Sequence, residues 1–227
     1  RVAAIVSLLL VGFNRALVPL IYKHHKEEDS PQKIADLFRF FMAFALLFFL
    51  GMSIFAQDIL WLLTNPEFYP AKNIVVFLVS AILFSQIYMF APGTAIAEKT
   101  RIIMWISVGS AVLNGLLNLI MIPWLGYIGA AIATMASHFI VCLINIKVSQ
   151  RYYPIPFDWV KIWSAAAAVA SLYGVSLYIE FGTSSAFVMK GILMVLASVV
   201  IVWSRLIAFS EISKSVTVVK GLFTPQR

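Results

Sequence analysis

Ile122-Pro123-Trp124-Leu125-Gly126 separates two long apolar runs, residues 102–124 and 127–149, with almost no polar sequence between them. Each run has the ~20 apolar residues that a helix needs to cross a bilayer. Proline and glycine both interrupt helices. We therefore expect these five residues to form a tight hairpin between two membrane-spanning helices.

The same pattern of apolar runs bounded by charged or turn residues continues on both sides of the hairpin. Seven runs cover residues 2–22, 37–56, 73–97, 102–124, 127–149, 160–180 and 187–207. We predict an all-α integral membrane protein with about seven transmembrane helices. Residues 1–210 are expected to form one helical bundle, and residues 211–227 a cytoplasmic tail that rests on the membrane surface.

The composition favours the same class. Of the 227 residues, 62% are hydrophobic and 12% are charged, whereas soluble domains have roughly 45–50% apolar and about 25% charged residues. A soluble core of this length could not bury so much apolar surface. This excludes a soluble enzyme, a secreted disulfide scaffold and a disordered protein. The single cysteine, Cys142, lies in an apolar stretch and leaves no disulfide framework or metal cluster.

Basic residues predict the orientation. Thirteen of the 17 Lys and Arg residues fall on one side of the predicted spans: Lys23, Lys26, Lys33, Arg39, Lys99, Arg101, Lys147, Arg151, Lys161, Arg205, Lys214, Lys220 and Arg227. The other side has Lys72 and Lys190, apart from Arg1. Cytoplasmic loops carry an excess of Lys and Arg, so the C-terminus is predicted to be cytoplasmic. The net charge of +7 then needs no nucleic-acid partner.

The N-terminus is predicted to lie outside. The chain begins at Arg1, directly in apolar sequence and without the cleavage site of a signal peptide. A helix that enters from the outside requires earlier spans to deliver it there. We therefore expect this chain to be one half of a longer protein.

Polar residues within the spans are the best candidates for function, because each costs free energy in lipid unless it is paired or hydrated. Arg15 lies in the first span, and either snorkels to the interface or faces an aqueous cavity, where its guanidinium suits phosphate or carboxylate. Asn114 and Asn118 share one helix face with Ser107 and Ser110. They would bond a neighbouring helix or contact sugar hydroxyls in a cavity.

His138 is a lone histidine near the middle of residues 127–149. No second ligand lies at metal-binding spacing, which leaves hydrogen bonding between helices or, less readily, proton coupling. In the same run, Gly129, Ala133 and Ser137 recur every four residues, and such small residues let helices approach closely. Pro92-Gly93 is expected to bend the third span.

Three further features complete the prediction. Residues 57–72 read as a short interfacial helix on the outer face. None of the ten acidic residues lies in the middle of a span, and there is no phosphate-binding loop or His-Glu-x-x-His motif, so we predict no enzyme and no cofactor.

The segment from Asn114 through Pro123 and Gly126 to Thr134, with its Gly-Ala-Ala-Ile-Ala-Thr ending, resembles the polysaccharide transporter, or O-antigen flippase, branch of the multidrug/oligosaccharidyl-lipid/polysaccharide exporter superfamily. Weaker similarity covers Arg15-Ala-Leu-Val-Pro19, residues 62–71 and Glu98-Lys-Thr100. Members have two helical bundles facing each other across a central cavity. The resemblance implies that this chain is the C-terminal lobe of a 14-span exporter-like fold.

The same resemblance implies a function in the bacterial inner membrane. The protein would flip an undecaprenyl-pyrophosphate-linked oligosaccharide to the outer leaflet by alternating access. Arg15, Asn114, Asn118 and His138 would line this half of the cavity. Its partners would be the lipid-linked oligosaccharide, membrane lipids and the missing N-terminal half, with glycan polymerase machinery as a candidate. The alternatives are a drug/cation antiporter of the same superfamily and a non-transporting scaffold of a glycan assembly complex.

Overall fold

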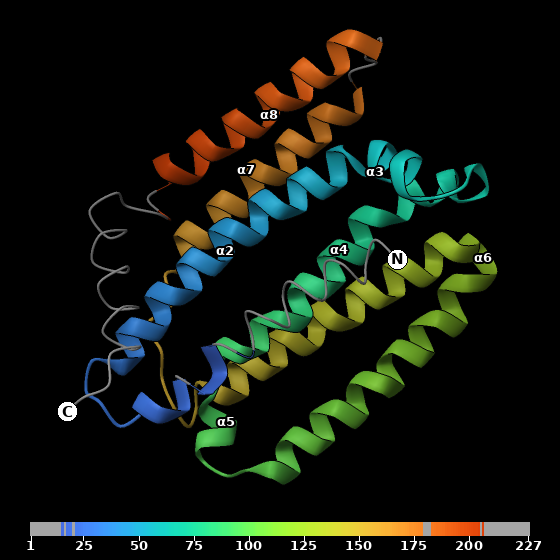
Figure 1. Ribbon diagram of the computed structural model, residues 1–227. Helices are drawn as coiled ribbons and strands as arrows, with labels where there is room; N and C mark the ends of the chain where they lie inside the picture. Colours follow the sequence, from blue (N-terminus) through green and yellow to red (C-terminus); the bar gives the residue numbers. More distant parts are fainter. Residues whose placement is uncertain (1–14, 16, 20, 179–182, 205, 207–227) are drawn as a thin grey trace. The chain divides into compact units, whose positions relative to one another are not determined.

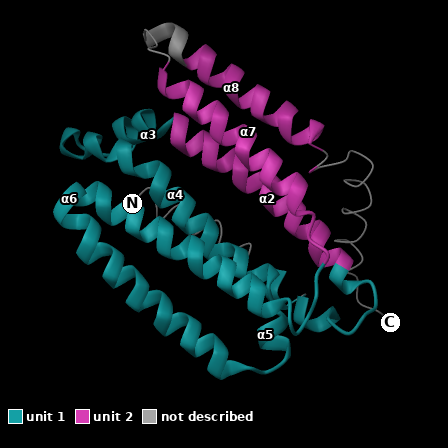
Figure 2. Ribbon diagram, turned by 180° about the vertical axis from the view of Figure 1, so that it is seen from behind, with its two compact units in different colours: residues 1–31, 55–155 teal, residues 32–54, 156–227 magenta. Residues whose placement is uncertain are grey.

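The computed structural model describes residues 15, 17–19, 21–178, 183–204 and 206. These residues are mostly helical, with turns and irregular segments between the helices and without a strand in the described ranges. They group into two compact units. Unit 1 comprises residues 1–31 and 55–155, and unit 2 comprises residues 32–54 and 156–227 (Figure 2). The predicted tail, residues 211–227, and most of the predicted first span lie outside the described residues.

Four described segments are long and apolar enough to cross a membrane: Ser30–Ile54, Pro66–Ile96, Thr100–Ser149 and Trp159–Tyr178. The 50-residue segment contains two of the predicted spans, and a shorter apolar helix covers Phe187–Trp203. The protein is therefore all-helical, with several helices suited to a bilayer. The count of seven spans remains a prediction.

The hairpin predicted from Pro123 and Gly126 is confirmed in α6 (Thr100–Ser149), whose two halves run side by side in opposite directions (Figure 1). The helix continues through Pro123 and is interrupted at Gly126. Gly126 has φ +56° and ψ −135°, a conformation that glycine adopts without the steric cost that a Cβ would bring. The reversal therefore lies three residues after the proline.

The second half of α6 contributes a row of small residues to the interior of unit 1. Gly129, Ala133 and Ser137 are all buried, as their four-residue spacing predicted. Neighbouring α4 (Lys72–Gln86) packs along α6, where Phe84 meets Phe139 with ring centroids 5.0 Å apart. Small side chains on one helix and aromatic ones between helices allow this close packing.

The third predicted span is broken, as Pro92-Gly93 predicted. After α4 the chain forms η2 (Ile87–Phe90), bends at Ala91, and continues as α5 (Gly93–Ile96). The backbone N–H of Gly93 donates to Ser149 Oγ over 2.8 Å, so the break is joined to the end of α6. At the same end, Tyr153 donates its hydroxyl to the carbonyl of His25 over 3.0 Å. The bond to Ser149 satisfies a backbone N–H that the interrupted helix leaves without a helical partner.

The predicted interfacial segment forms α3 (Ala56–Leu63) and η1 (Pro66–Ala71). Ala56 and Leu60 face inward, whereas Trp61 and Leu62 are 70% and 76% exposed. One buried side and one exposed apolar side are typical of a helix that lies in a membrane interface.

Unit 2 packs α2 (Ser30–Ile54), α7 (Trp159–Tyr178) and α8 (Thr183–Trp203) together. Pro31 lies in the first turn of α2, where a missing N–H costs no hydrogen bond. Phe49 of α2 contacts Tyr173 of α7 with centroids 6.0 Å apart, and Phe38 meets Phe157 at 4.7 Å. Aromatic pairs therefore join α2 to α7 and to the segment that precedes it.

Asp158 immediately precedes α7 and is paired with Lys161. Lys161 Nζ lies 2.6 Å from Asp158 Oδ2, and the backbone N–H of Lys161 donates to Oδ1 over 3.3 Å. The side-chain bond from Lys161, aided by the charge of Arg39, holds the pKa of the Asp158 carboxyl below its ordinary value of 3.8. The ionised carboxylate therefore stabilises the fold above pH 3.8, and this contribution is lost as the pH falls through the folded-state pKa.

We expect Asp158→Asn, which keeps a good helix cap but removes the charge, to lower the thermal midpoint of the detergent-solubilised protein at neutral pH. The difference from wild type should shrink as the pH falls below 3.8. Thermal unfolding between about pH 7 and 3 measures it. Asp158→Ala, which also removes the cap, should cost a further ~1 kcal/mol at every pH. A wild-type–Asn difference that does not vary with pH would contradict this account of the ion pair.

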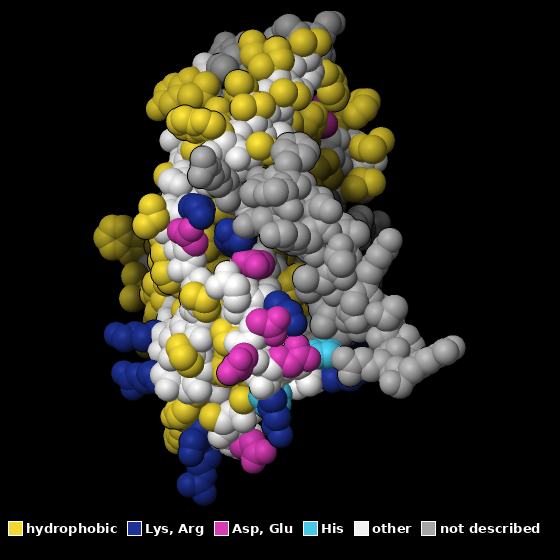
Figure 3. Space-filling model, turned by 90° about the vertical axis from the view of Figure 1, so that its left-hand side faces the viewer, with side chains coloured by type: hydrophobic (Ala, Val, Ile, Leu, Met, Phe, Trp, Pro, Cys, Tyr) yellow, Lys and Arg dark blue, Asp and Glu magenta, His cyan; other side chains and the backbone are white. Residues whose placement is uncertain are grey.

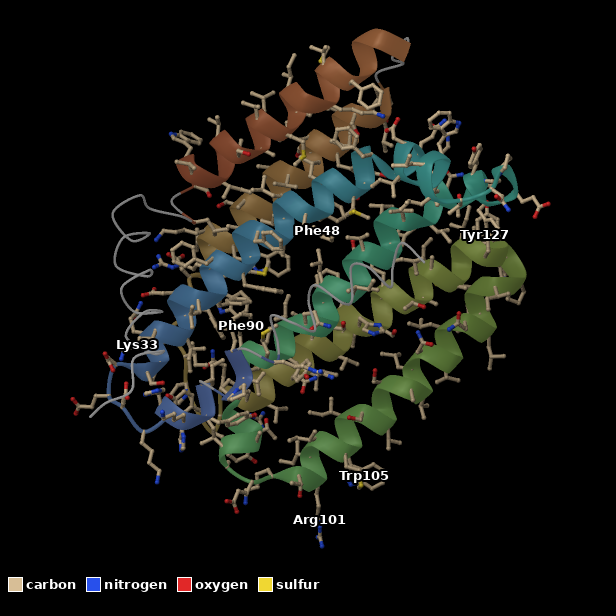
Figure 4. All side chains as sticks on the ribbon, in the orientation of Figure 1. Lys33, Phe48, Phe90, Arg101, Trp105 and Tyr127 are labelled. Atoms are coloured by element: carbon tan, nitrogen blue, oxygen red, sulfur yellow. The ribbon has the colours of Figure 1, made fainter. Side chains whose placement is uncertain are left out.

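Figure 3 shows that basic side chains on the face in view are interspersed with acidic ones. The predicted cytoplasmic connections contain both signs, as in Lys23 and Lys26 followed by Glu27, Glu28 and Asp29. In Figure 4, Arg101 and Trp105 lie together at one end of the first half of α6, and Tyr127 lies at the hairpin turn. Trp105 is 67% exposed, as expected of an aromatic anchor at a membrane interface.

Candidate functional site

Asn114 of the predicted stripe connects the two halves of the α6 hairpin, and Asn118 bonds to Asn114 within the first half. Asn114 donates from Nδ2 to Ser137 Oγ over 3.0 Å, although 23 residues separate them in the chain. Asn118 donates to the carbonyl oxygen and to Oδ1 of Asn114, over 2.9 and 3.0 Å. Of the two predicted roles, the structure shows the bond between helices directly. Both side chains are half-buried and retain polar atoms beyond these bonds.

Ser137 is the fixed partner in this network. Its side chain is fully buried, at 0% exposure, and its hydroxyl donates to the carbonyl of Thr134 over 2.9 Å. The lone pairs of Oγ are then available to the amide of Asn114. A buried hydroxyl that both donates and accepts avoids the desolvation cost of an unpaired group. The serine therefore holds Asn114 in one orientation.

His138 lies one residue further along, with Nδ1 2.8 Å from the carbonyl oxygen of Thr134. A carbonyl oxygen can only accept, so Nδ1 must carry the hydrogen. In the neutral imidazole, Nε2 then has a free lone pair and acts as an acceptor. The histidine is half-buried. Its geometry suits it to accept a hydrogen bond from a neutral group.

The two stretches that form the packed helices α4 and α6 are uncharged over most of their length. Residues 73–97 and 102–146 include no Asp, Glu, Lys or Arg. The polar side chains of α6 therefore offer hydrogen bonds, without an ion pair from these two stretches.

Arg15 is described as part of a helix and is exposed. No hydrogen bond joins it to the hairpin among the described residues, and residues 1–14, 16 and 20 are not described. The structure thus places Asn114, Asn118 and His138 on one hairpin, with Asn114 bonded to Ser137, the neighbour of His138 in the chain. The contribution of Arg15 to a shared site remains a prediction.

Sequence reasoning missed Asn145. It follows His138 by seven residues, two helical turns, and therefore lies on the same face. Its Nδ2 donates to the carbonyl of Val141 over 3.1 Å. Thr134, four residues before His138, also lies on this face and donates to Ala130 over 2.8 Å. The four- and seven-residue spacings around His138 were the signal in the sequence that could have identified both.

Metal binding finds no support in the parts of the chain that the structure describes. No group of three or more His, Cys, Asp or Glu side chains lies close enough together to hold an ion in these residues. Cys142 is a buried free thiol in the second half of α6.

Comparison of the chain with family models, curated proteins and solved structures finds no significant match.

Proposed function

We propose that this protein is a membrane transporter that flips an undecaprenyl-pyrophosphate-linked oligosaccharide from the inner to the outer leaflet of a bacterial inner membrane. The observation that supports it best is the neutral polar site on α6. Asn114, Asn118 and His138 lie together within a stretch of 45 residues, 102–146, that has no charged side chain. Amides and neutral imidazoles are suited to hydroxyl groups such as those of sugars.

Arg15 supplies the complementary chemistry in this proposal. A guanidinium can hold phosphate oxygens through two parallel hydrogen bonds. It lies in the first predicted span, toward the predicted cytoplasmic end, where a lipid-linked substrate enters from the inner leaflet. The pyrophosphate would meet Arg15, and the sugars would meet the polar side chains of α6. Alternating access would then carry the substrate outward, with the bend at Pro92-Gly93 and the small-residue row of α6 permitting helix movement.

The drug/cation antiporter of the same superfamily is less well supported. That activity calls for an acidic side chain in the middle of a membrane-spanning helix to bind the cation. The seven predicted spans contain one acidic residue, Glu180, at the end of residues 160–180. A scaffold with no transport activity requires only the polar atoms that join its helices. The experiment below would favour a scaffold if the well-expressed wild type failed to restore surface glycan.

We expect the complete gene to restore surface glycan in a flippase-deficient strain, and Arg15→Ala to abolish most of that restoration. The loss should exceed tenfold, because a charge-assisted bidentate contact contributes about 1.5–3 kcal/mol. Arg15→Lys should restore part of the activity, since the charge remains but the planar fork is lost. Surface glycan is measured by electrophoresis of extracted polysaccharide, with protein abundance in the membrane as the normalising control.

Asn114 needs a separate control because it also joins the two halves of the hairpin. Ser137→Ala removes the partner of Asn114 while leaving the amide in place. If Asn114→Ala reduces flipping of the abundant, folded protein and Ser137→Ala does not, the amide acts on substrate. Equal losses in both variants would assign Asn114 to helix packing alone. Failure of the well-expressed wild type to restore glycan would refute the transport function.

A further inference from the structure

The second half of α6 has an exposed apolar side and, roughly opposite it, a polar side. The apolar side is formed by residues that are 39%, 43% and 43% exposed, namely Ile140, Leu143 and Ile144. At about 100° per residue, Thr134, His138 and Asn145 lie on roughly the opposite side. These three residues are called the polar face below. The polar side chains therefore point away from the side that is suited to lipid.

The polar face lies between two flanks that pack against neighbours. On one flank, Ser137 is buried and accepts the bond from Asn114 of the first half of the hairpin. On the other, Cys142 and Ile146 are buried next to Phe139, which contacts Phe84 of α4. The three polar residues between these flanks are only half-buried. A polar, partly open strip between two packed flanks is the arrangement of a helix that faces water or ligand inside a membrane protein.

Each residue of the polar face makes one hydrogen bond from its side chain to a backbone carbonyl of its own helix. Thr134, His138 and Asn145 bond the carbonyls of the residues four positions earlier, over 2.8, 2.8 and 3.1 Å. These bonds consume donors, and they leave Nε2 of His138, Oδ1 of Asn145 and Oγ1 of Thr134 with free lone pairs. The polar face therefore presents mainly acceptors. Its complement is a neutral group that donates, and a phosphate oxygen cannot do so.

We propose that the polar face is a hydrated contact surface for the sugar hydroxyls of the transported substrate, with Asn145 and Thr134 as further binding residues beside His138. Thr134 and Asn145 are eleven positions apart, about 16 Å along the helix axis, so the contact can follow an extended glycan. The assignment of sugar rests on the proposed function, whereas the hydration of the face does not. The lipid and pyrophosphate parts of the substrate would bind elsewhere.

The first experiment tests hydration without any transport assay. Single cysteines replace Thr134, His138 or Asn145 in a Cys142→Ala background. Leu143→Cys and Ile144→Cys, on the exposed apolar side of the same helix, are the matched controls. Because the thiolate is the reactive form and needs water, a membrane-impermeant, hydrophilic methanethiosulfonate should modify the polar-face thiols at least about tenfold faster than the controls in proteoliposomes. Equal rates, or faster modification of the controls, would overturn the proposal.

The second experiment tests for sugar. We expect undecaprenyl-pyrophosphate-linked oligosaccharide to slow modification of His138→Cys and Asn145→Cys severalfold, and undecaprenyl pyrophosphate without sugar to leave both rates unchanged. Protection by both lipids would overturn the assignment to sugar, since the lipid or pyrophosphate would then cover the face.

A flipping assay on the same Cys142→Ala proteoliposomes separates the two hypotheses. If the protein flips the lipid-linked oligosaccharide but the oligosaccharide gives no protection, the polar face is not a sugar contact and the proposed function stands. If the protein does not flip and no protection occurs, the proposed function is refuted, and the sugar assignment with it. Rapid modification of the polar face would in that case still show that it is hydrated.

Discussion

Replacing Gly93 with alanine is expected to cause one of the two largest losses of stability in this protein. A Cβ at this position would lie 2.2 Å from the carbonyl oxygen of Ser149 and 2.9 Å from the backbone N of Tyr153. Both are backbone atoms of the end of α6, so neither can rotate away. The substitution must push α5 from α6 and stretch the bond from Gly93 N–H to Ser149 Oγ. The steric cost alone is about 1–3 kcal/mol.

The thermal midpoint of the purified protein in detergent measures this loss, at about 2–4 °C per kcal/mol for a chain of this size. Gly109→Ala is the matched control, because nothing lies within 4 Å of its Cβ position and it is inside a helix. It should leave the protein unchanged or stabilise it by up to about 1 kcal/mol. Ser149→Ala should itself destabilise, because it leaves the Gly93 N–H without its acceptor. A Gly93→Ala midpoint equal to that of Gly109→Ala would show that the contact between α5 and α6 is not as close as described.

Gly129→Ala is expected to cause the second large loss, by opening the α6 hairpin. Its Cβ would lie 2.2 Å from the carbonyl oxygen of Met121 and 3.1 Å from Leu125 Cβ. Met121 precedes the interruption at Gly126, and the reversal there folds it onto Gly129. We expect a destabilisation of about 1–3 kcal/mol or more. Because the hairpin holds Asn114 against Ser137, the proposed flipping activity should fall as well.

Gly115→Ala is the control for this substitution, since it lies in the other half of the hairpin with no atom within 4 Å of its Cβ position. It should match or exceed wild type in thermal midpoint. Cysteine pairs across the two halves offer a second measurement, because cross-linking depends on their separation. If Gly129→Ala has the same cross-linking yield and thermal midpoint as Gly115→Ala, then the Met121 carbonyl does not lie close to Gly129 in the folded protein.

Much of the fold could be predicted from local sequence. A long uncharged apolar run predicts a helix, because a segment that crosses a bilayer must satisfy the hydrogen bonds of its own backbone. Pro92-Gly93 predicted the break after α4, and the hairpin at Gly126 followed from glycine's freedom at positive φ. The row Gly129, Ala133 and Ser137 predicted which side of α6 is buried. The start of α2 at Ser30 was seven residues earlier than predicted, because the charged first turns of a helix do not resemble a membrane span.

The candidate site was less predictable, because its geometry depends on contacts between residues far apart in the chain. The sequence alone could not choose between a packing and a ligand role for Asn114, and the bond to Ser137 became visible only with the hairpin in three dimensions. Asn145 is an isolated asparagine near the end of a span, and such a residue resembles an interfacial one in the sequence. Its seven-residue spacing places it on the face of His138, and the structure shows that this face is half-buried.

The sequence by itself determined that this protein is helical and apolar, where its helices break, and that residues 102–146 contain no charge. These properties depend on residue type and on neighbours within a few positions, so they can be read along the chain. Only the tertiary structure decided that Gly93 meets Ser149, that Asn114 meets Ser137, and that Thr134, His138 and Asn145 share a half-buried face. The physical reason is that packing between helices fixes which side of each helix is covered, and helical periodicity alone leaves that choice open.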